Sequence, residues 1–249
     1  MGAVETLGRI RFVLCRSVHP GNVGATARAL ATMGLARLTL VAPAAFPHPD
    51  ATARARGAGG LLDAAVICAR LAEALSGTVA VAGLTARPRE LAVRARSPRE
   101  AAAELVTEAA AGGEVAVVLG NETCGLSNAE LALCSFPVGI PADPAFPSLN
   151  VAAAAQVMAY ELRLAALGDA PRPRRGGPPA SFGEVEGLLE ALERSMIETG
   201  FLDPANPRRM MLRLRRLFAR AGLEREEVNI LRGIAAAWHS KVDRNTGTL

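Results

Sequence analysis

Residues 115–131 read VAVVLGNETCGLSNAEL, and this stretch decides the class of fold. Its first six residues are apolar and rich in valine, which is typical of a buried strand. The glycines that follow allow the backbone to turn and to approach a ligand closely. Ser127 and Glu130 then have the spacing of a capping box, which predicts the start of a helix. A strand that breaks into a glycine turn and a new helix indicates an α/β protein.

Strand and helix signals alternate in the same way on both sides of this stretch. Short apolar segments predict five further strands, at 9–15, 37–41, 65–68, 78–83 and 136–140. Helices are predicted over 22–33, after a cap at Ser97, and from a cap at Ser148 to about residue 167. This alternation predicts a mostly parallel sheet with helices on both faces and ligands beyond the carboxyl ends of the strands. The candidate binding loops are therefore those after Gly83, Gly120 and Ile140.

A segment rich in glycine and proline, GDAPRPRRGGPPA at residues 168–180, divides the chain. We expect it to be a linker, because this composition sustains neither a helix nor a strand. It separates an α/β domain at 1–167 from a small, all-helical domain at 181–249. Three helices are predicted there, starting at Ser181, Asn206 and Glu224. The second has an apolar stripe formed by Met210, Met211, Leu214, Leu217, Phe218 and Ala221.

The bulk properties set limits on the protein class. The chain has 249 residues, half of them hydrophobic, which suffices for one α/β core and a smaller domain. No apolar run approaches the roughly 18 residues of a membrane helix, and the first residues do not resemble a signal peptide. Four cysteines and three histidines lack metal-ligand spacing, so we expect no metal site and reduced thiols in a cytoplasmic protein. The net charge of +4 permits a polyanionic partner without requiring one. A GC-rich genome also explains the abundance of arginine.

Two other loops have ligand-binding character. In residues 17–28, SVHPGNVGATAR, a turn leads into a long helix with Asn22 near its start and Arg28 about two turns later. This turn lacks both the Walker signature and the Gly-x-Gly-x-x-Gly of dinucleotide-binding proteins, which disfavours a dinucleotide-dependent oxidoreductase. Residues 140–150, IPADPAFPSLN, form a proline-rich loop before the last long helix of the first domain. Taken singly, each loop also fits an ordinary connection, with Asn22 as a helix cap and Arg28 as a solvated residue.

Together, and in this order, the three stretches resemble the motifs of the SPOUT methyltransferases. Asn22-x5-Arg28 is similar to the first motif, LGxExxGLxN at 119–128 to the second, and IP…SLN at 140–150 to the third. The segments AQVMAYE at 155–161, RLRRLFAR at 213–220 and NILRG at 229–233 narrow the resemblance to TrmJ-type tRNA 2′-O-methyltransferases. The resemblance extends from about residue 9 to about residue 238, and it includes the helical domain.

The resemblance implies a SPOUT fold, whose mostly parallel sheet carries a C-terminal deep trefoil knot. It also implies the cofactor S-adenosyl-L-methionine, with S-adenosyl-L-homocysteine as the product. By carry-over, the residues that bind the methyl donor are Leu84, Thr85, Ala86, Gly120, Glu122, Ile140, Pro147, Ser148 and Leu149. Arg28 and Asn22 correspond to the catalytic positions. Arginine is too weak a base at neutral pH to take the proton of the ribose 2′-hydroxyl. We therefore expect Arg28 to hold the neighbouring phosphate and to stabilise the developing alkoxide, with Asn22 as a positioning group.

The implied substrate is a ribose of tRNA, by analogy the anticodon-loop nucleotide at position 32. The family also implies a homodimer with its active site across the subunit interface, and no membrane partner. Two positions depart from the pattern. Asn121 stands where close relatives often carry arginine, which removes a candidate RNA contact, and Pro147 stands where they often carry serine.

Four arginines of the second predicted helix of the C-terminal domain share one face, opposite its apolar stripe: Arg209, Arg213, Arg216 and Arg220. From spacing alone, an RNA-binding face and a solvated helix face fit equally well. The linker residues Arg172, Arg174 and Arg175 favour RNA binding, which should then depend strongly on salt. Two alternatives to tRNA methylation stay open: 2′-O-methylation of ribosomal RNA, and a noncatalytic RNA-binding protein with the same fold.

Overall fold

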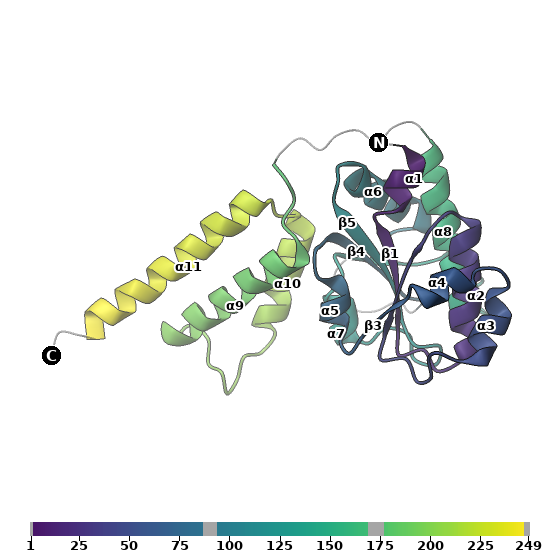
Figure 1. Cartoon of the computed structure of the whole chain (residues 1–249). Helices are drawn as coiled ribbons and strands as arrows, with labels where there is room; N and C mark the ends of the chain where they lie inside the picture. The colour runs from purple at the N-terminus through teal and green to yellow at the C-terminus, as the bar shows by residue number, and fades with distance from the viewer. Residues whose placement is uncertain (1, 87–93, 169–176, 247–249) are drawn as a thin grey trace. The chain divides into compact units, whose positions relative to one another are not determined.

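The computed structural model describes residues 2–86, 94–168 and 177–246, with the backbone alone for residues 239–246. The chain divides into two compact units, Met1–Arg174 and Arg175–Leu249, and Figure 1 labels most of their elements. Among the described helices, none combines the length and the apolar character needed to cross a membrane.

A six-stranded parallel sheet forms the centre of the first unit. Its strands are β1 (Ile10–Cys15), β2 (Arg37–Val41), β3 (Val66–Cys68), β4 (Thr78–Leu84), β5 (Glu114–Leu119) and β6 (Phe136–Val138). Their order is β3-β2-β1-β5-β4-β6, and every neighbouring pair is parallel. The predicted α/β class and all six predicted strands are confirmed. The trefoil knot stays a prediction.

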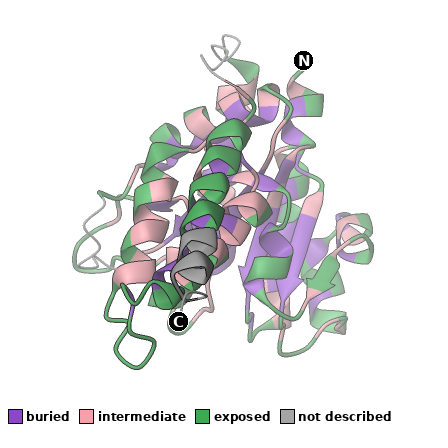
Figure 2. Ribbon diagram, turned by 90° about the vertical axis from the view of Figure 1, so that its left-hand side faces the viewer, coloured by how far each residue is buried: buried purple, intermediate pink, exposed green. Residues whose placement is uncertain are grey.

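Helices cover both faces of this sheet. They are α1 (Ala3–Leu7), α2 (Pro20–Thr32), α3 (Pro49–Ala55), α4 (Gly59–Asp63), α5 (Leu71–Leu75), α6 (Pro98–Ala110), α7 (Asn128–Ala132) and α8 (Val151–Leu167). Helices α2 and α6 both pack against α8 over the face that buries Phe12, whereas α5 and α7 lie on the other side of the sheet (Figure 1). Figure 2 shows the buried residues concentrated in the strands, as expected for a sheet whose two faces are both covered by helices.

Two predicted helix starts in the first unit are wrong. Helix α2 begins at Pro20 with His19 as its N-cap, so Asn22 lies inside the first turn. The reason is that proline favours the first helical position, which moves the cap to the residue before it. Helix α8 is capped by Asn150, whose side-chain oxygen accepts a hydrogen bond from the backbone N–H of Ala152, and not by Ser148. The capping boxes predicted at Ser97 and Ser127 are both confirmed.

The second unit consists of α9 (Phe182–Glu198), α10 (Met210–Ala221) and α11 (Arg225–Thr246). Its buried core includes Leu188, Leu192, Met196, Val228 and Ala235. The capping box at Ser181 is confirmed, but the helix predicted from Asn206 starts only at Met210. Arg208 interrupts it, because its φ of 50° is left-handed and incompatible with a right-handed helix. Leu217 and Ala221 are exposed, so their predicted place in the apolar stripe is also wrong, whereas Met210, Met211, Leu214 and Phe218 pack against the core.

Candidate active site

A pocket opens where the loops after three neighbouring strands, β5, β4 and β6, come together. Its empty volume is about 770 Å³, a figure that includes the solvent at its open mouth. All nine residues predicted to bind the methyl donor line it: Leu84, Thr85, Ala86, Gly120, Glu122, Ile140, Pro147, Ser148 and Leu149. Parallel strands end at the same edge of a sheet, and this edge brings together loops that are far apart in the sequence.

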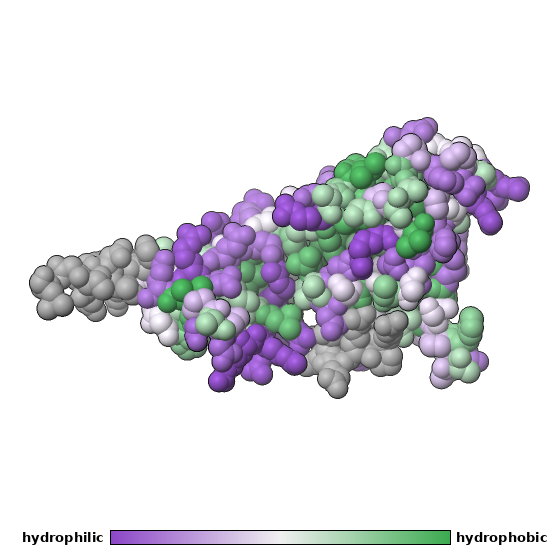
Figure 3. Space-filling view, turned by 90° about the horizontal axis from the view of Figure 1, so that it is seen from below, coloured by the Kyte–Doolittle hydropathy of each residue, from purple (hydrophilic) through white to green (hydrophobic). Residues whose placement is uncertain are grey.

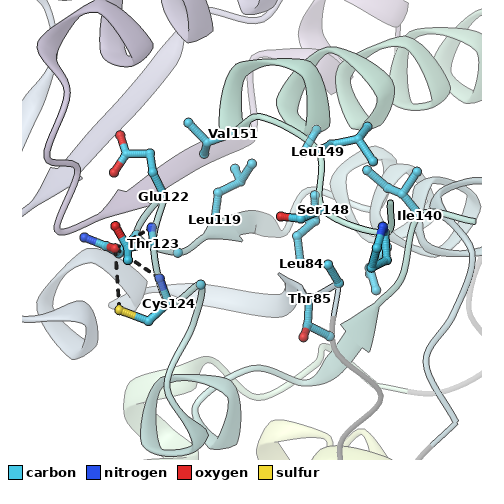
Figure 4. A pocket seen from close by; sticks show the side chains of 17 residues that line it. Leu84, Thr85, Leu119, Glu122, Thr123, Cys124, Ile140, Ser148, Leu149 and Val151 are labelled. Carbon is cyan, nitrogen blue, oxygen red and sulfur yellow. Dashed lines mark hydrogen bonds between the residues drawn. The ribbon is translucent and has the colours of Figure 1, made fainter. Parts of the chain in front are cut away.

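The pocket combines apolar and polar walls. Figure 4 shows Glu122 and Thr123 on one side, Thr85 and Ser148 on the other, and Leu119 between them. Figure 3 views the molecule from below, toward the carboxyl ends of the strands, and on this face hydrophobic residues lie directly beside hydrophilic ones. Such a lining suits a ligand with a flat apolar part and a hydroxylated part.

Gly120 fixes the shape of the turn after β5. A Cβ atom at this position would lie 2.1 Å from the carbonyl carbon of Gly125 and 2.1 Å from the backbone nitrogen of Leu126. Two stretches of backbone therefore pass each other at a distance that no side chain tolerates. Gly125 itself has a φ of 67°, the left-handed conformation that glycine adopts at little cost. The pocket wall depends on both glycines.

Asn121, which departs from the family pattern, closes this turn. Its amide donates a hydrogen bond to the carbonyl oxygen of Arg16 at 2.8 Å, and its Oδ1 accepts one from the backbone N–H of Thr123 at 2.8 Å. A side chain that bonds to the backbone two residues later is typical of an asparagine turn. Asn121 thus joins the turn after β5 to the end of β1.

Glu122 joins the second motif to the first. Its carboxylate accepts hydrogen bonds from Ser17 Oγ at 2.7 Å, the backbone N–H of Val18 at 2.9 Å and Asn22 Nδ2 at 3.0 Å. Burial raises the pKa of Glu122, but these hydrogen bonds outweigh burial and lower the pKa to about 2. The carboxylate therefore stays charged at neutral pH, and it holds the loop between β1 and α2 against the pocket.

Asn22 extends this connection to the third motif. Its Oδ1 accepts a hydrogen bond from Asn150 Nδ2 at 3.0 Å, while its own amide donates to Glu122. One chain of side chains, Glu122–Asn22–Asn150, thus ties all three motifs together. Sequence reasoning gave no structural role to Ser17 and named Asn150 only as part of the third motif. The contact between the two asparagines could not be predicted from local sequence patterns, because 128 residues separate them.

Arg28 lies on α2 and is exposed to solvent. It does not line the pocket described above but a neighbouring hollow, together with Ala25, Ala53, Arg54 and Arg56. Within the described parts of the chain, Arg28 has no ion pair. The structure thus brings together the nine predicted donor-binding residues and Asn22, and it places Arg28 beside them on the outer side of α2.

The predicted arginine face of the second unit lies on α10. Arg213 and Arg220 are exposed, Arg216 is half-buried, and Arg209 forms the N-cap of the helix. Arg215, which is outside the predicted set, pairs with Glu186 of α9. None of the four predicted arginines forms an ion pair with a residue that the structure describes. The linker residues Arg172, Arg174 and Arg175 lie outside the described residues.

The chain is similar to known proteins over nearly its whole length. Residues 9–160 match the SpoU rRNA Methylase family, and residues 183–247 match the C-terminal domain of the tRNA methyltransferase TrmJ. The tRNA (cytidine/uridine/adenosine-2′-O-)-methyltransferase TrmJ of Pseudomonas aeruginosa is 47% identical, with 92% of this chain and 93% of the relative covered.

Solved structures agree with these matches. The crystal structure of TrmJ from Z. mobilis has a TM-score of 0.81 at 29% identity, over 92% of this chain and 98% of that chain. The SpoU methyltransferase AviRb from Streptomyces viridochromogenes, solved with AdoMet, shares the fold at a TM-score of 0.50 and 24% identity, over 63% of this chain and 57% of that chain. The parallel sheet, its three converging loops and the helical second unit all fit these relatives, and the chain belongs to the SpoU methylase family, among its TrmJ-type members.

Proposed function

We propose that the protein transfers a methyl group from S-adenosyl-L-methionine to the 2′-hydroxyl of a ribose in tRNA. One observation carries this proposal: three loops converge on one pocket, and hydrogen bonds among Glu122, Asn22 and Asn150 connect this pocket to α2, the helix that carries Arg28. The relatives that match both units are tRNA 2′-O-methyltransferases, which supports tRNA over other RNA. We further propose that the first unit carries the transfer site and the second unit holds RNA, in the cytoplasm.

The pocket residues fit the proposed methyl donor. Leu84, Ile140 and Leu149 offer an apolar surface for an adenine ring, and the hydroxyls of Thr85 and Ser148 offer partners for a ribose. When bound there, the donor supplies an electrophilic methyl group on a sulfonium. Gly120 lets two backbone segments pack closely behind the site, and the wall of this pocket thereby keeps a fixed shape.

The chemistry left to the protein is alignment of the ribose and stabilisation of negative charge. Arg28 is exposed and permanently cationic, and it fits a role as a clamp on the phosphate next to the target ribose. From there the guanidinium stabilises the negative charge that develops on the 2′-oxygen of the ribose as the hydroxyl loses its proton. Asn22 holds the start of α2 against the pocket, because both ends of its amide are engaged by Glu122 and Asn150. We therefore assign Asn22 a positioning role.

The placement of Arg28 outside the donor pocket supports an active site shared by two subunits. A second copy of the chain brings its own Arg28 to the donor held by the first copy. Tyr160, Leu164 and Leu167 form an exposed apolar face on α8, at a spacing that places them on one side of the helix. A homodimer can bury such a face, because homodimer interfaces are more apolar than the rest of a protein surface.

The unpaired arginines of α10 support tRNA binding by the second unit. Arg209, Arg213 and Arg220 form no ion pair with the residues of this unit that the structure describes, and RNA phosphates are suited to pair with them. The anticodon-loop nucleotide at position 32 is the proposed target, by analogy with the family, and the trefoil knot is the proposed path of the chain around the pocket.

The test compares methyl transfer to unmodified tRNA transcripts and to ribosomal RNA fragments, with mass-spectrometric mapping of the product. We expect a 2′-O-methyl group in the anticodon loop of tRNA and slower transfer to ribosomal RNA. Faster transfer to ribosomal RNA would support that alternative substrate. RNA binding without transfer to either substrate would support the noncatalytic alternative.

A further inference from the structure

A polar groove lies between α2 and α3, next to the donor pocket. It consists of two adjoining hollows that share Ala25, Ala53 and Arg54. One hollow reaches Asn22 and Asn150, the two asparagines that tie the motifs together, and the other reaches Arg28 and Arg56. The groove therefore connects the transfer site with the outer face of α2, and Arg54 lies where its two halves meet.

Two glycines of α2 bring α3 close enough to form this groove. A Cβ atom on Gly24 would lie 2.0 Å from the carbonyl oxygen of Ala51, so the two helices touch through their backbones. A Cβ atom on Gly21 would lie 3.6 Å from Cγ of Arg54, which places the Arg54 side chain beside the first turn of α2. The N-terminal turn of a helix carries partial positive charge, and this adds to the charge of the arginine.

The charges that face the groove are mainly positive. Arg28, Arg54 and Arg56 are all exposed, and within the described residues none of the three forms an ion pair. Asp50 is the carboxylate that lines the groove, and its Oδ2 lies 3.7 Å from Nδ1 of His48. Three permanent cations and one carboxylate leave an excess of positive charge that nothing described in this unit neutralises.

Arg56 reaches the groove at a conformational cost. It ends α3 with a φ of 36°, in the left-handed region that is unfavourable for a residue with a side chain. Glycine adopts this conformation freely. A strained arginine at a helix end that glycine would suit better points to a role for its side chain outside the fold.

We propose that Arg54 and Arg56 bind backbone phosphates of the RNA substrate that flank the nucleotide held by Arg28. The inference rests on the proposed function and adds a substrate-binding groove to it. Successive guanidinium groups along an open groove match the repeated phosphates of a nucleic acid strand, and each can bind a phosphate through two parallel hydrogen bonds. Arg54 and Arg56 thus hold the strand while Arg28 acts on the target ribose.

The test measures the affinity for fluorescent tRNA transcripts at several salt concentrations. Arg54→Ala should weaken binding about ten-fold at low salt, as expected for one charge-assisted contact, and should lower the slope of log affinity against log salt by about 0.9. Arg54→Lys should restore most of the slope. The control is Arg70→Ala, which removes the exposed arginine at the N-cap of α5, ion-paired with Glu73 and outside the groove, and should leave the slope unchanged.

Kinetics and stability separate this inference from the proposed function. Arg54→Ala should raise the KM for tRNA and leave kcat at saturating tRNA within about two-fold, with donor affinity unchanged. Arg56→Gly should weaken tRNA binding in the same way without lowering the melting temperature, since glycine relieves the strained φ. If wild-type protein methylates tRNA and Arg54→Ala behaves like Arg70→Ala, the groove inference is wrong. If wild-type protein neither binds nor methylates tRNA, the proposed function is wrong as well.

Discussion

Replacing Glu122 with glutamine tests the link that joins the first two motifs. The change keeps the size of the side chain but removes its charge and one of its two acceptor oxygens. The three close donors are Ser17 Oγ, the backbone N–H of Val18 and Asn22 Nδ2. A glutamine amide in this place presents N–H groups to donors, so at least one hydrogen bond is lost and one donor is left unpaired.

The expected magnitude follows from these hydrogen bonds. A hydrogen bond to a charged group contributes roughly 1.5–3 kcal/mol, and Glu122 is only half-buried, which screens its charge. We therefore expect Glu122→Gln to lower the free energy of unfolding by about 2 kcal/mol. For a unit of this size, that corresponds to a fall of roughly 4–8 °C in melting temperature. The matched control is Glu5→Gln, at an exposed site, with a change within about 0.5 kcal/mol.

The pH dependence gives a second, independent readout. The folded pKa of Glu122 is about 2, below its ordinary value of 4.5. Its carboxylate therefore stabilises the fold fully above pH 4.5, and this stabilisation is lost as the pH falls from 4.5 toward 2. Urea unfolding at neutral pH and at pH 3 should show a smaller difference in stability between wild-type protein and Glu122→Gln at the lower pH. A stability difference that is absent at neutral pH, or that persists unchanged at pH 3, would refute the reasoning.

Three further predictions concern the pocket. Gly120→Ala should weaken the binding of S-adenosyl-L-methionine by more than about ten-fold in calorimetry, because its Cβ meets backbone at 2.1 Å, whereas Gly60→Ala in α4 meets nothing within 4 Å and should bind normally. Cys124 is exposed in the pocket, so the methyl donor should slow its labelling by maleimide; an unchanged rate would contradict donor binding there. Buried Cys15, whose pKa is raised to about 12 by burial, should stay unlabelled. Mixing inactive Arg28→Ala and Gly120→Ala chains should restore about a quarter of wild-type activity if the site is shared across a dimer, and none if each chain acts alone.

The sheet and the starts of α6, α7 and α9 followed from local sequence signals. Val115 and its neighbours are a valine-rich run bounded by glycine, and the capping boxes at Ser97, Ser127 and Ser181 are local in sequence. Such features depend on a few adjacent residues, so they are visible without the fold. The short helix α3 was missed, although Pro49 after His48 is a start signal, because its seven residues carry little apolar periodicity.

The contacts that organise the site were beyond sequence reasoning. Asn22 was expected to cap a helix, yet Pro20 moves the cap to His19 and frees the asparagine to bridge Glu122 and Asn150. The groove that Arg54 lines depends on the close approach of Gly24 to Ala51. The asparagine bridge and the groove both arise from residues that are distant in the chain, so no local pattern of charge or hydropathy predicts them.

The measurement that tests the central claim most directly is transfer of labelled methyl from S-adenosyl-L-methionine to tRNA by wild-type protein and by Arg28→Ala, with donor affinity measured in parallel. We expect a ribose 2′-O-methyl product from wild-type protein and a loss of at least about 100-fold in kcat for Arg28→Ala, at unchanged donor affinity. Unchanged transfer by Arg28→Ala, or no transfer to tRNA by wild-type protein that binds the donor, would contradict the account.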